Sequence, residues 1–242
     1  MEFSGTFELE DTTVDEVWLA LSDPAMIRSS LPGCKFLYHV EDGDPDFDAL
    51  RERAGSEEQP EPTADPDVID ERSFVESGRY AALVQIGVGS VKPTFETVVT
   101  IDRREKPEME ASGEGSAGDS SFEMSSWMGL EATEDGGVAV DWRAEADVFG
   151  RIANMGQRVI NPVANRVVKR FFSSIQSNLQ ELTIQAESEA DAETETPPEE
   201  GAAPAGTAPN GNEGTVVEES GDDTQRGGLL SRLLGRIRGI FG

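Results

Sequence analysis

Histidine and cysteine are almost absent from this chain of 242 residues, which contains one of each, His39 and Cys34. One cysteine excludes an intrachain disulfide and a cysteine metal cluster. A histidine-based triad or a cysteine–histidine pair would have to use these two residues, which belong to one short segment. We expect His39 at the surface or at the edge of the core, and Cys34 as a small buried apolar side chain.

Lysine is scarce as well. Four of the 20 basic residues are lysine, 48 residues are acidic, and the net charge is −28. The acid is spread along the chain, because residues 1–186 alone carry a net charge of −20. The sequence shows no basic stripe on these residues for neutralising phosphates, which argues against nucleic acid as a partner.

An even excess of acid destabilises a fold by self-repulsion at low salt. The acidic, lysine-poor and arginine-using composition therefore resembles proteins of the haloarchaeal type, from organisms that keep molar salt in the cytoplasm. An ordinary acidic protein of a low-salt organism is the alternative.

Long apolar runs are missing too. Met1 leads directly into alternating strand sequence, so we expect no secretory signal peptide. The apolar segment at residues 226–242 is shorter than the roughly 20 residues that span a bilayer. We expect the protein in the cytoplasm, with any membrane contact made at the inner face of the cell membrane.

Alternating apolar and polar residues predict strands over much of the first 150 residues. After a strand at 2–10, helical spacing predicts two short helices ending at Pro24 and Pro32. Six further strands are expected near residues 35–40, 82–88, 91–101, 109, 122–130 and 138–148. The polar faces of the last two hold Glu123, Glu131, Asp141, Arg143, Glu145 and Asp147. Strands with one wet face indicate an antiparallel sheet.

A long helix is predicted from Arg151 to about Ala186, because its apolar residues advance by three or four positions. Pro162 lies inside it and predicts a kink. The fold class is therefore α+β: a curved, seven-stranded antiparallel sheet holds the long helix, with two short helices after the first strand. This order is typical of the helix-grip fold of the START-like superfamily.

Residues 1–186 are predicted to form one START-like helix-grip domain, and three regions differ from it in composition. Residues 41–70 are acidic and rich in proline and glycine, which predicts a solvated insertion loop between strands. Residues 187–225 contain twelve acidic and no basic residues, which predicts a disordered acidic linker. Residues 226–242 predict an amphipathic membrane-binding helix.

That terminal helix has one apolar face bordered by arginines. At ~100° per residue its apolar members share a sector of about 140°. They are Leu229, Leu230, Leu233, Leu234, Ile237, Ile240 and Phe241, with Arg232, Arg236 and Arg238 at the borders. Arginine stems at such borders can lie on apolar surface while the guanidinium groups reach phosphates. Docking onto a partner enzyme or onto the domain itself is the alternative.

The Gly113-x-Gly115-x-x-Gly118 motif matches the dinucleotide-binding pattern by letter. It precedes a predicted strand, whereas the pattern must open a helix, so we interpret it as a turn.

Mixed residue sizes on the inner face of the sheet predict either a ligand cavity or a filled core. The bulky members are Phe95, Phe122, Met124, Met128 and Trp142, and the small ones are Gly5, Ala82, Ser126, Ala144 and Ala146. Met155, Val159 and Val163 would form the helical wall. An apolar wall suits an isoprenoid tail, and Gln157, Arg158 or Lys92 are candidates for contacting a quinone head.

Three short motifs resemble the CoxG family of carbon monoxide dehydrogenase proteins over roughly residues 1–185. They are Leu31-Pro32-Gly33-Cys34, the segment from Ile86 to Phe95 (IGVGSVKPTF), and the segment from Asn154 to Arg158 (NMGQR). The resemblance favours the ligand cavity over the filled core. It also implies a START-like carrier. Such carriers are encoded beside molybdenum hydroxylases and are involved in attaching them to the membrane. The acidic insertion at 41–70 departs from the family pattern.

The first hypothesis is a non-enzymatic, membrane-tethered accessory protein. It recruits a molybdenum-containing hydroxylase of the carbon monoxide dehydrogenase type to the cytoplasmic membrane surface and binds a hydrophobic small molecule, menaquinone or a similar isoprenoid quinone. The alternative is a free START-like lipid or quinone carrier without a dehydrogenase partner. A cyclase or hydrolase would need an acid/base pair in the cavity.

Overall fold

The computed structural model describes residues 1–88 and 90–194. Its elements are β1 (Glu2–Leu9), α1 (Val14–Ser22), α2 (Pro24–Ser30), β2 (Cys34–Val40), α3 (Phe47–Ser56), α4 (Pro66–Arg72), β3 (Arg79–Gln85), β4 (Thr94–Glu105), β5 (Glu108–Ala117), β6 (Ser120–Ala132), β7 (Val138–Gly150), the 3-10 helix η1 (Ala153–Met155) and α5 (Gln157–Thr194). Residues 1–182 form one compact unit.

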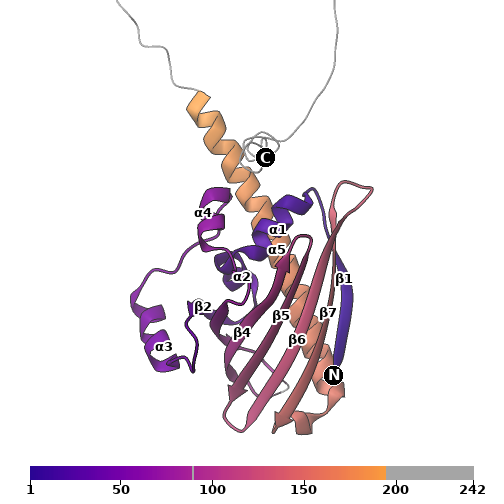
Figure 1. The fold of residues 1–242 in the computed structure, drawn as a ribbon. Helices are drawn as coiled ribbons and strands as arrows, with labels where there is room; N and C mark the ends of the chain where they lie inside the picture. The colour runs from indigo at the N-terminus through magenta and orange to yellow at the C-terminus, as the bar shows by residue number, and fades with distance from the viewer. Residues whose placement is uncertain (89, 195–242) are drawn as a thin grey trace, which may run out of the picture. The chain divides into compact units, whose positions relative to one another are not determined.

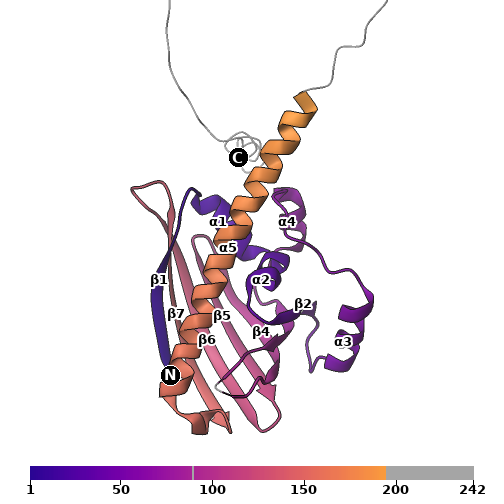
Figure 2. The ribbon, with the colours of Figure 1, turned by 180° about the vertical axis from the view of Figure 1, so that it is seen from behind.

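All seven strands belong to one antiparallel sheet with the order β1-β7-β6-β5-β4-β3-β2. Figures 1 and 2 show α5 crossing one face of this sheet, with α1 and α2 at one end. We call the face toward α5 the inner face. The predicted α+β helix-grip fold, with its curved sheet and two short helices after β1, is therefore confirmed.

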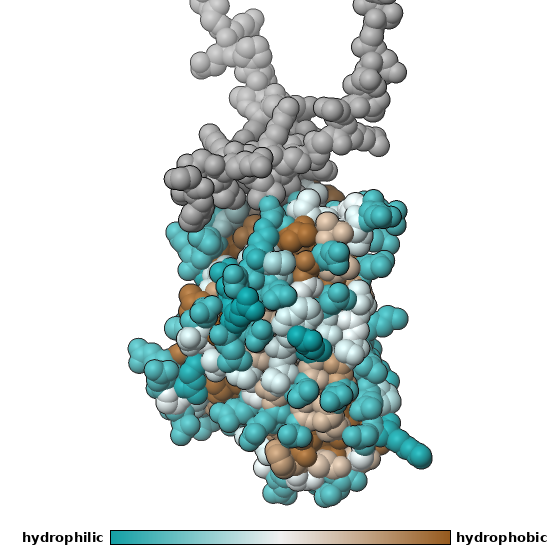
Figure 3. Space-filling view, turned by 45° about the vertical axis from the view of Figure 1, so that its right-hand side comes forward, coloured by the Kyte–Doolittle hydropathy of each residue, from teal (hydrophilic) through white to brown (hydrophobic). Residues whose placement is uncertain are grey.

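The outer face of the sheet carries the charge. The acidic residues predicted there are exposed, among them Glu123 on β6 and Asp141 on β7. Arg143 covers the Trp127 ring on this face at 4.4 Å from the ring centroid. Hydrophilic side chains cover much of the surface in view in Figure 3.

Side-chain caps define where the short helices begin. Thr13 accepts a hydrogen bond from the Glu16 amide, and the Glu16 carboxylate accepts one from the Thr13 amide, which is a capping box at α1. Asp23 caps α2, and Pro24 occupies its first turn, where proline needs no amide partner.

The long helix begins later and ends later than predicted. Residues 153–155 form η1, and Gly156 has a φ of 75°, which breaks the chain direction before α5 starts at Gln157. α5 then continues through Pro162 to Thr194, beyond the predicted boundary at Ala186. Alanine and glutamate, which recur in residues 187–194, favour helix and explain the extension.

The insertion at 41–70 is not a plain loop, because it contains α3 and most of α4. Asp46 and Asp65 cap these helices through their side chains. α4 is attached to the domain by Ile69, which is buried, and by Arg72, whose Nη2 donates to Asp23 Oδ2 at 2.7 Å. Because the Asp23 side chain is 1% exposed, Arg72 stabilises an otherwise isolated buried carboxylate.

The insertion also covers part of the edge strand β2. The Arg53 guanidinium of α3 lies over the Tyr38 ring at 4.4 Å, and Gln59 donates to the Lys35 carbonyl at 3.1 Å. An uncovered edge strand offers free backbone groups to other chains. The insertion therefore protects this edge.

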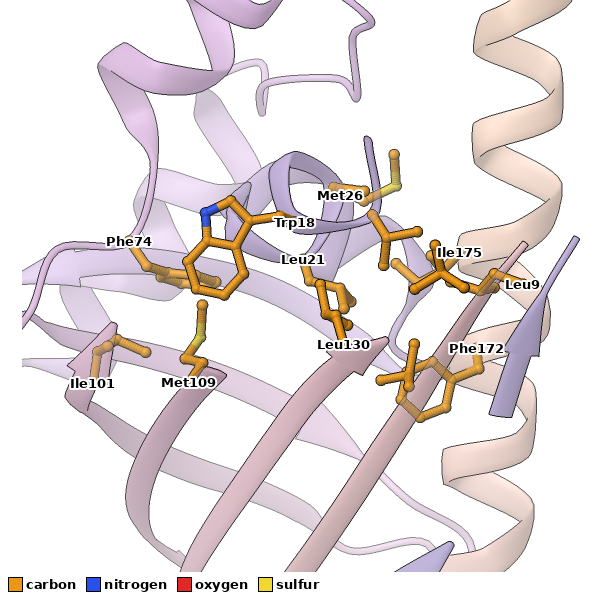
Figure 4. Close-up of a cluster of buried hydrophobic side chains, with 14 of the residues drawn as sticks. Leu9, Trp18, Leu21, Met26, Phe74, Ile101, Met109, Leu130, Phe172 and Ile175 are labelled. Atoms are coloured by element: carbon orange, nitrogen blue, oxygen red, sulfur yellow. The ribbon is translucent and has the colours of Figure 1, made fainter. Parts of the chain in front are cut away.

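The core is divided into two apolar clusters. The large cluster, drawn in Figure 4, joins Trp18 and Leu21 of α1 to Leu130 of β6 and to Phe172 and Ile175 of α5. The small cluster lies elsewhere on the sheet and contains Val88, Phe95 and Ile152, with Val159, Ile160 and Val163 packed against it. Domains usually have one continuous core, so the division is informative.

The predicted linker beyond Thr194 and the predicted terminal helix at 226–242 lie outside the described residues. The ten side chains predicted for membrane binding, from Leu229 to Phe241, therefore stay a prediction.

Candidate functional site

An apolar cavity of about 460 Å³ is lined by side chains from both clusters and from α5. Val88 and Phe95 of the small cluster and Phe74 and Tyr80 of the large cluster line it. Helix α5 contributes Ile160, Val163, Ala164, Val167 and Val168. Small-molecule sites are mainly apolar and occupy roughly 300–1,000 Å³, so this cavity is the candidate site.

The structure brings six of the nine predicted cavity residues together. Phe95, Phe122, Met124, Trp142, Ala144 and Val163 all line the cavity. Met128 instead packs against the large cluster, whereas Met155 and Val159 pack against the small one. The helical wall lies further along α5 than predicted, because the helix starts at Gln157.

Small residues in the middle of the sheet make room for the cavity. The register aligns Ala144, Ser126 and Ala111 in one row across β7, β6 and β5. The next two rows contain Gly113 and Gly115 of β5. Because each of these three adjacent rows contains small residues, fewer side-chain atoms fill the space between the sheet and α5.

Gly113 and Gly115 are inner-face positions of β5 and not a turn, which corrects the sequence interpretation; Gly118 alone lies in the β5–β6 turn. A Cβ on Gly115 would lie 2.5 Å from the Phe122 ring and 2.8 Å from Thr97 Oγ1. Phe122 can therefore lie across β5 and pack edge-on against Phe95, with 5.4 Å between ring centroids.

The cavity lining contains few polar groups. The Tyr80 hydroxyl accepts a hydrogen bond from the Val75 amide at 3.0 Å, and Thr97 adds a second hydroxyl. None of the residues that line this cavity is Asp, Glu, His, Lys or Arg. The titratable side chains of the lining are Cys34 and Tyr80.

Cys34 is half-buried and lines the cavity with its thiol. Burial raises its pKa from 9.0 to about 11, against smaller lowering effects of Arg28 and of the hydrogen bond that Sγ donates to the Phe36 carbonyl at 3.3 Å. His39 is exposed at the other end of β2 and packs edge-on against Tyr80 at 5.2 Å.

Two polar pockets adjoin the cavity. One shares Val163 with it and contains Lys92 and Arg158, two of the residues proposed for a quinone head. The other shares Leu31 and Cys34 with it and runs past serines of α2 and α5. Gln157 is exposed and lines none of these three spaces.

The motifs that carry the family resemblance gather at these spaces. Leu31 and Cys34 flank Gly33, which has a φ of 83° and whose Cβ would lie 2.1 Å from the Gln85 carbonyl oxygen. Only glycine fits there without moving β3. Ile86, Val88 and Phe95 of the second motif line the cavity.

Within residues 1–88 and 90–194, no group of three or more His, Cys, Asp or Glu side chains is arranged to hold a metal ion. No helix in the same ranges is long and apolar enough to cross a membrane.

Residues 71–180 match the model of the carbon monoxide dehydrogenase CoxG family. Among solved structures, a conserved protein from Geobacillus kaustophilus is 22% identical, with a TM-score of 0.56 over 75% of this chain and 96% of its own. A START superfamily protein from Mycobacterium smegmatis is 9% identical (TM-score 0.48, 75% and 98% covered). The Zhui aromatase/cyclase from Streptomyces sp. R1128 is 12% identical (TM-score 0.44, 74% and 93% covered). No curated protein matches the sequence.

The first prediction concerns the floor of the cavity. In Gly115→Ala the new methyl group overlaps the Phe122 ring and Thr97 Oγ1, and both of these side chains line the cavity. We expect weaker binding of an apolar fluorescent probe and, from overpacking, a loss of about 1–3 kcal/mol in the free energy of unfolding. Probe titration and urea unfolding measure the two effects.

Gly55→Ala is the matched control, because Gly55 lies in α3 with no atom within 4 Å of its Cβ position. We expect it to leave probe binding unchanged and to stabilise by about 0.5–1 kcal/mol. Equal probe binding and equal free energies of unfolding in the two variants would contradict the proposed role of Gly115.

The second prediction concerns the Cys34 thiol. With its pKa raised to about 11, Cys34 carries about a hundredfold less thiolate at neutral pH than in the unfolded chain. We expect alkylation by iodoacetamide to be correspondingly slow and to accelerate up to about pH 11. The same shift contributes stability below pH 9, which is lost as the pH rises through 11. A labelling rate that levels off near pH 9 would contradict this prediction.

Proposed function

We propose that this chain, whose residues 71–180 match the CoxG family model and which has the helix-grip fold, is an accessory protein that binds an apolar small molecule under α5. The single observation that carries the proposal is the cavity of about 460 Å³ between two apolar clusters, with no charged residue in its lining. A binding role needs no acid/base pair, whereas a cyclase or hydrolase does.

The ligand that we propose is menaquinone or another isoprenoid quinone or prenyl lipid. Its tail would contact aliphatic walls such as Val163 and Val167, and its ring would lie against aromatic side chains such as Phe95 and Trp142. The hydroxyl of Thr97 could donate to a quinone carbonyl. A neutral head group fits this lining, because a charge would be buried without a partner.

An apolar occupant would also stabilise the domain. An occupant that binds the folded domain and not the unfolded chain raises the free energy of unfolding by mass action.

The partner that we propose is a molybdenum-containing hydroxylase of the carbon monoxide dehydrogenase type, at the cytoplasmic face of the cell membrane. The match of residues 71–180 to the CoxG family supports this partner. The arginine-bordered apolar pattern of residues 226–242 supports membrane tethering. The resulting function is recruitment of the hydroxylase and supply of a quinone, without catalysis by this chain.

The third prediction uses the three tryptophans of the chain as reporters. Trp142 lines the cavity, Trp18 is buried in the large cluster and Trp127 lies on the outer face. We expect a menaquinone to quench the fluorescence of Trp142 by contact, and Trp142→Phe to lose most of this quenching. Fluorescence titration measures it.

A matched pair of variants on β7 tests where the quinone binds. Ala146→Leu fills the cavity, whereas Ala139→Leu adds the same bulk at an alternate position of the strand, outside the cavity lining. Only Ala146→Leu should abolish quenching. Equal quenching in both variants would place the quinone elsewhere.

The fourth prediction concerns the tether. We expect the full chain to float with liposomes in a density gradient and a chain truncated after Gln225 to stay behind. Salt screens arginine–lipid attraction and strengthens apolar burial, so Leu233→Ser should weaken flotation in molar salt more than Arg232→Gln. Equal flotation of the truncated chain would disprove tethering by residues 226–242.

A further inference from the structure

The basic residues of this acidic protein are unevenly placed. Residues 1–150 contain eleven basic and thirty-five acidic residues, whereas residues 151–180 contain five basic residues and no acidic one. This second stretch includes η1 and most of α5. A local positive potential along α5 therefore stands against the negative charge of the rest of the domain.

Three cations meet in one pocket of about 440 Å³ between the β3–β4 connection and α5. Lys92 comes from the connection, and Arg158 and Arg166 come from α5, with Gly87, Ser90 and Pro162 between them. Arg158, Pro162 and Arg166 are spaced by four residues, so they follow one face of the helix. No acidic residue lines this pocket.

The pocket cations have no counter-ion in the described part of the chain. Arg51, Arg53, Arg72, Arg103 and Lys106 each form an ion pair with a carboxylate. Lys92, Arg158 and Arg166 form none with any side chain that the structure describes, at residues 1–88 and 90–185. Like charges held together without a counter-ion repel, and an anion bound among them would relieve that repulsion.

Apolar residues border the same pocket. Val159 and Val163 line it beside the arginines, and Val163 also lines the apolar cavity. Val159 packs in the small cluster with Val88. A molecule bound in the pocket would therefore contact cations on one side and aliphatic side chains on the other.

We propose that Lys92, Arg158 and Arg166 bind the phosphate group of a membrane lipid beside α5. A phosphate has several oxygens that can accept from more than one cation, and arginine favours such bidentate contacts. The aliphatic border favours a phosphate that carries lipid chains over a free phosphate. This site is separate from the quinone proposal, because its residues other than Val163 do not line the cavity.

The test compares three soluble probes on the full chain by calorimetry, at the lowest salt concentration at which circular dichroism shows that the chain is folded. They are dihexanoyl phosphatidic acid, which carries phosphate and chains, inorganic phosphate, and dihexanoylglycerol, which lacks phosphate. All three are used as monomers, so binding does not depend on residues 226–242 and a bilayer. We expect the phosphatidic acid to bind most tightly and dihexanoylglycerol to bind weakest.

The variant pair Arg158→Gln/Arg166→Gln should weaken phosphatidic acid binding by about tenfold or more, since two charge-assisted contacts are lost. Lys35→Gln/Lys169→Gln removes the same charge at exposed positions outside the pocket and should change binding less than about twofold. Both pairs should still show quenching of Trp142 by menaquinone, which separates this site from the proposed function.

Equal weakening by the two variant pairs would overturn the site, because net charge would then explain the binding. Unchanged binding in Arg158→Gln/Arg166→Gln would overturn it as well. Inorganic phosphate binding as tightly as phosphatidic acid would overturn the lipid as the source of the phosphate.

Discussion

The architecture depends on how α5 is held against the sheet. At one end Phe172 stacks on Phe7 of β1 at 5.2 Å, and Ile175 is fully buried in the large cluster. At the other end Ile160 and Val163 pack against Phe95 and Ile152 in the small cluster. Between these two attachments the inner face of the sheet presents alanine, serine and glycine, so the helix spans a space that its neighbours do not fill. The cavity is a consequence of this two-point attachment.

The attachment of α5 at the large cluster also explains the roles of α1 and of the insertion at residues 41–70. Figure 4 shows Trp18 of α1 beside Phe74 and Met109, and Leu21 of α1 beside Leu130, so α1 completes the large cluster. α4 in turn holds α1 and α2 through the contact of Arg72 with Asp23. The insertion is therefore part of the support for the large cluster as well as a cover for the edge strand, although nearly all of its own surface is polar.

Sequence patterns predicted the fold class and the order of the elements because alternation and helical spacing each have a fixed period. They also placed Phe122, Met124 and Trp142 on the inner face. They missed that Gly113 and Gly115 make room for the cavity. The space above a glycine depends on how the neighbouring strands are aligned with it, and the local sequence does not determine that alignment. They missed α4 for another reason: Asp65-Pro66 is the same helix-start signal as Asp23-Pro24, but the surrounding acid and proline obscured it. The cluster of basic residues on α5 was also missed, because the net charge was considered only for residues 1–186 as a whole.

The two candidate sites share one turn of α5, and this links their behaviour. Val163 lines both the apolar cavity and the cationic pocket, and Arg166 follows it by three residues on α5. Both residues follow Pro162, so no proline interrupts the turn that joins them. A shift of this turn that widens the cavity beside Val163 also moves Arg166, so the affinity of the pocket for an anion differs before and after the shift. By linkage, an occupant of the cavity and an anion in the pocket then affect each other's binding.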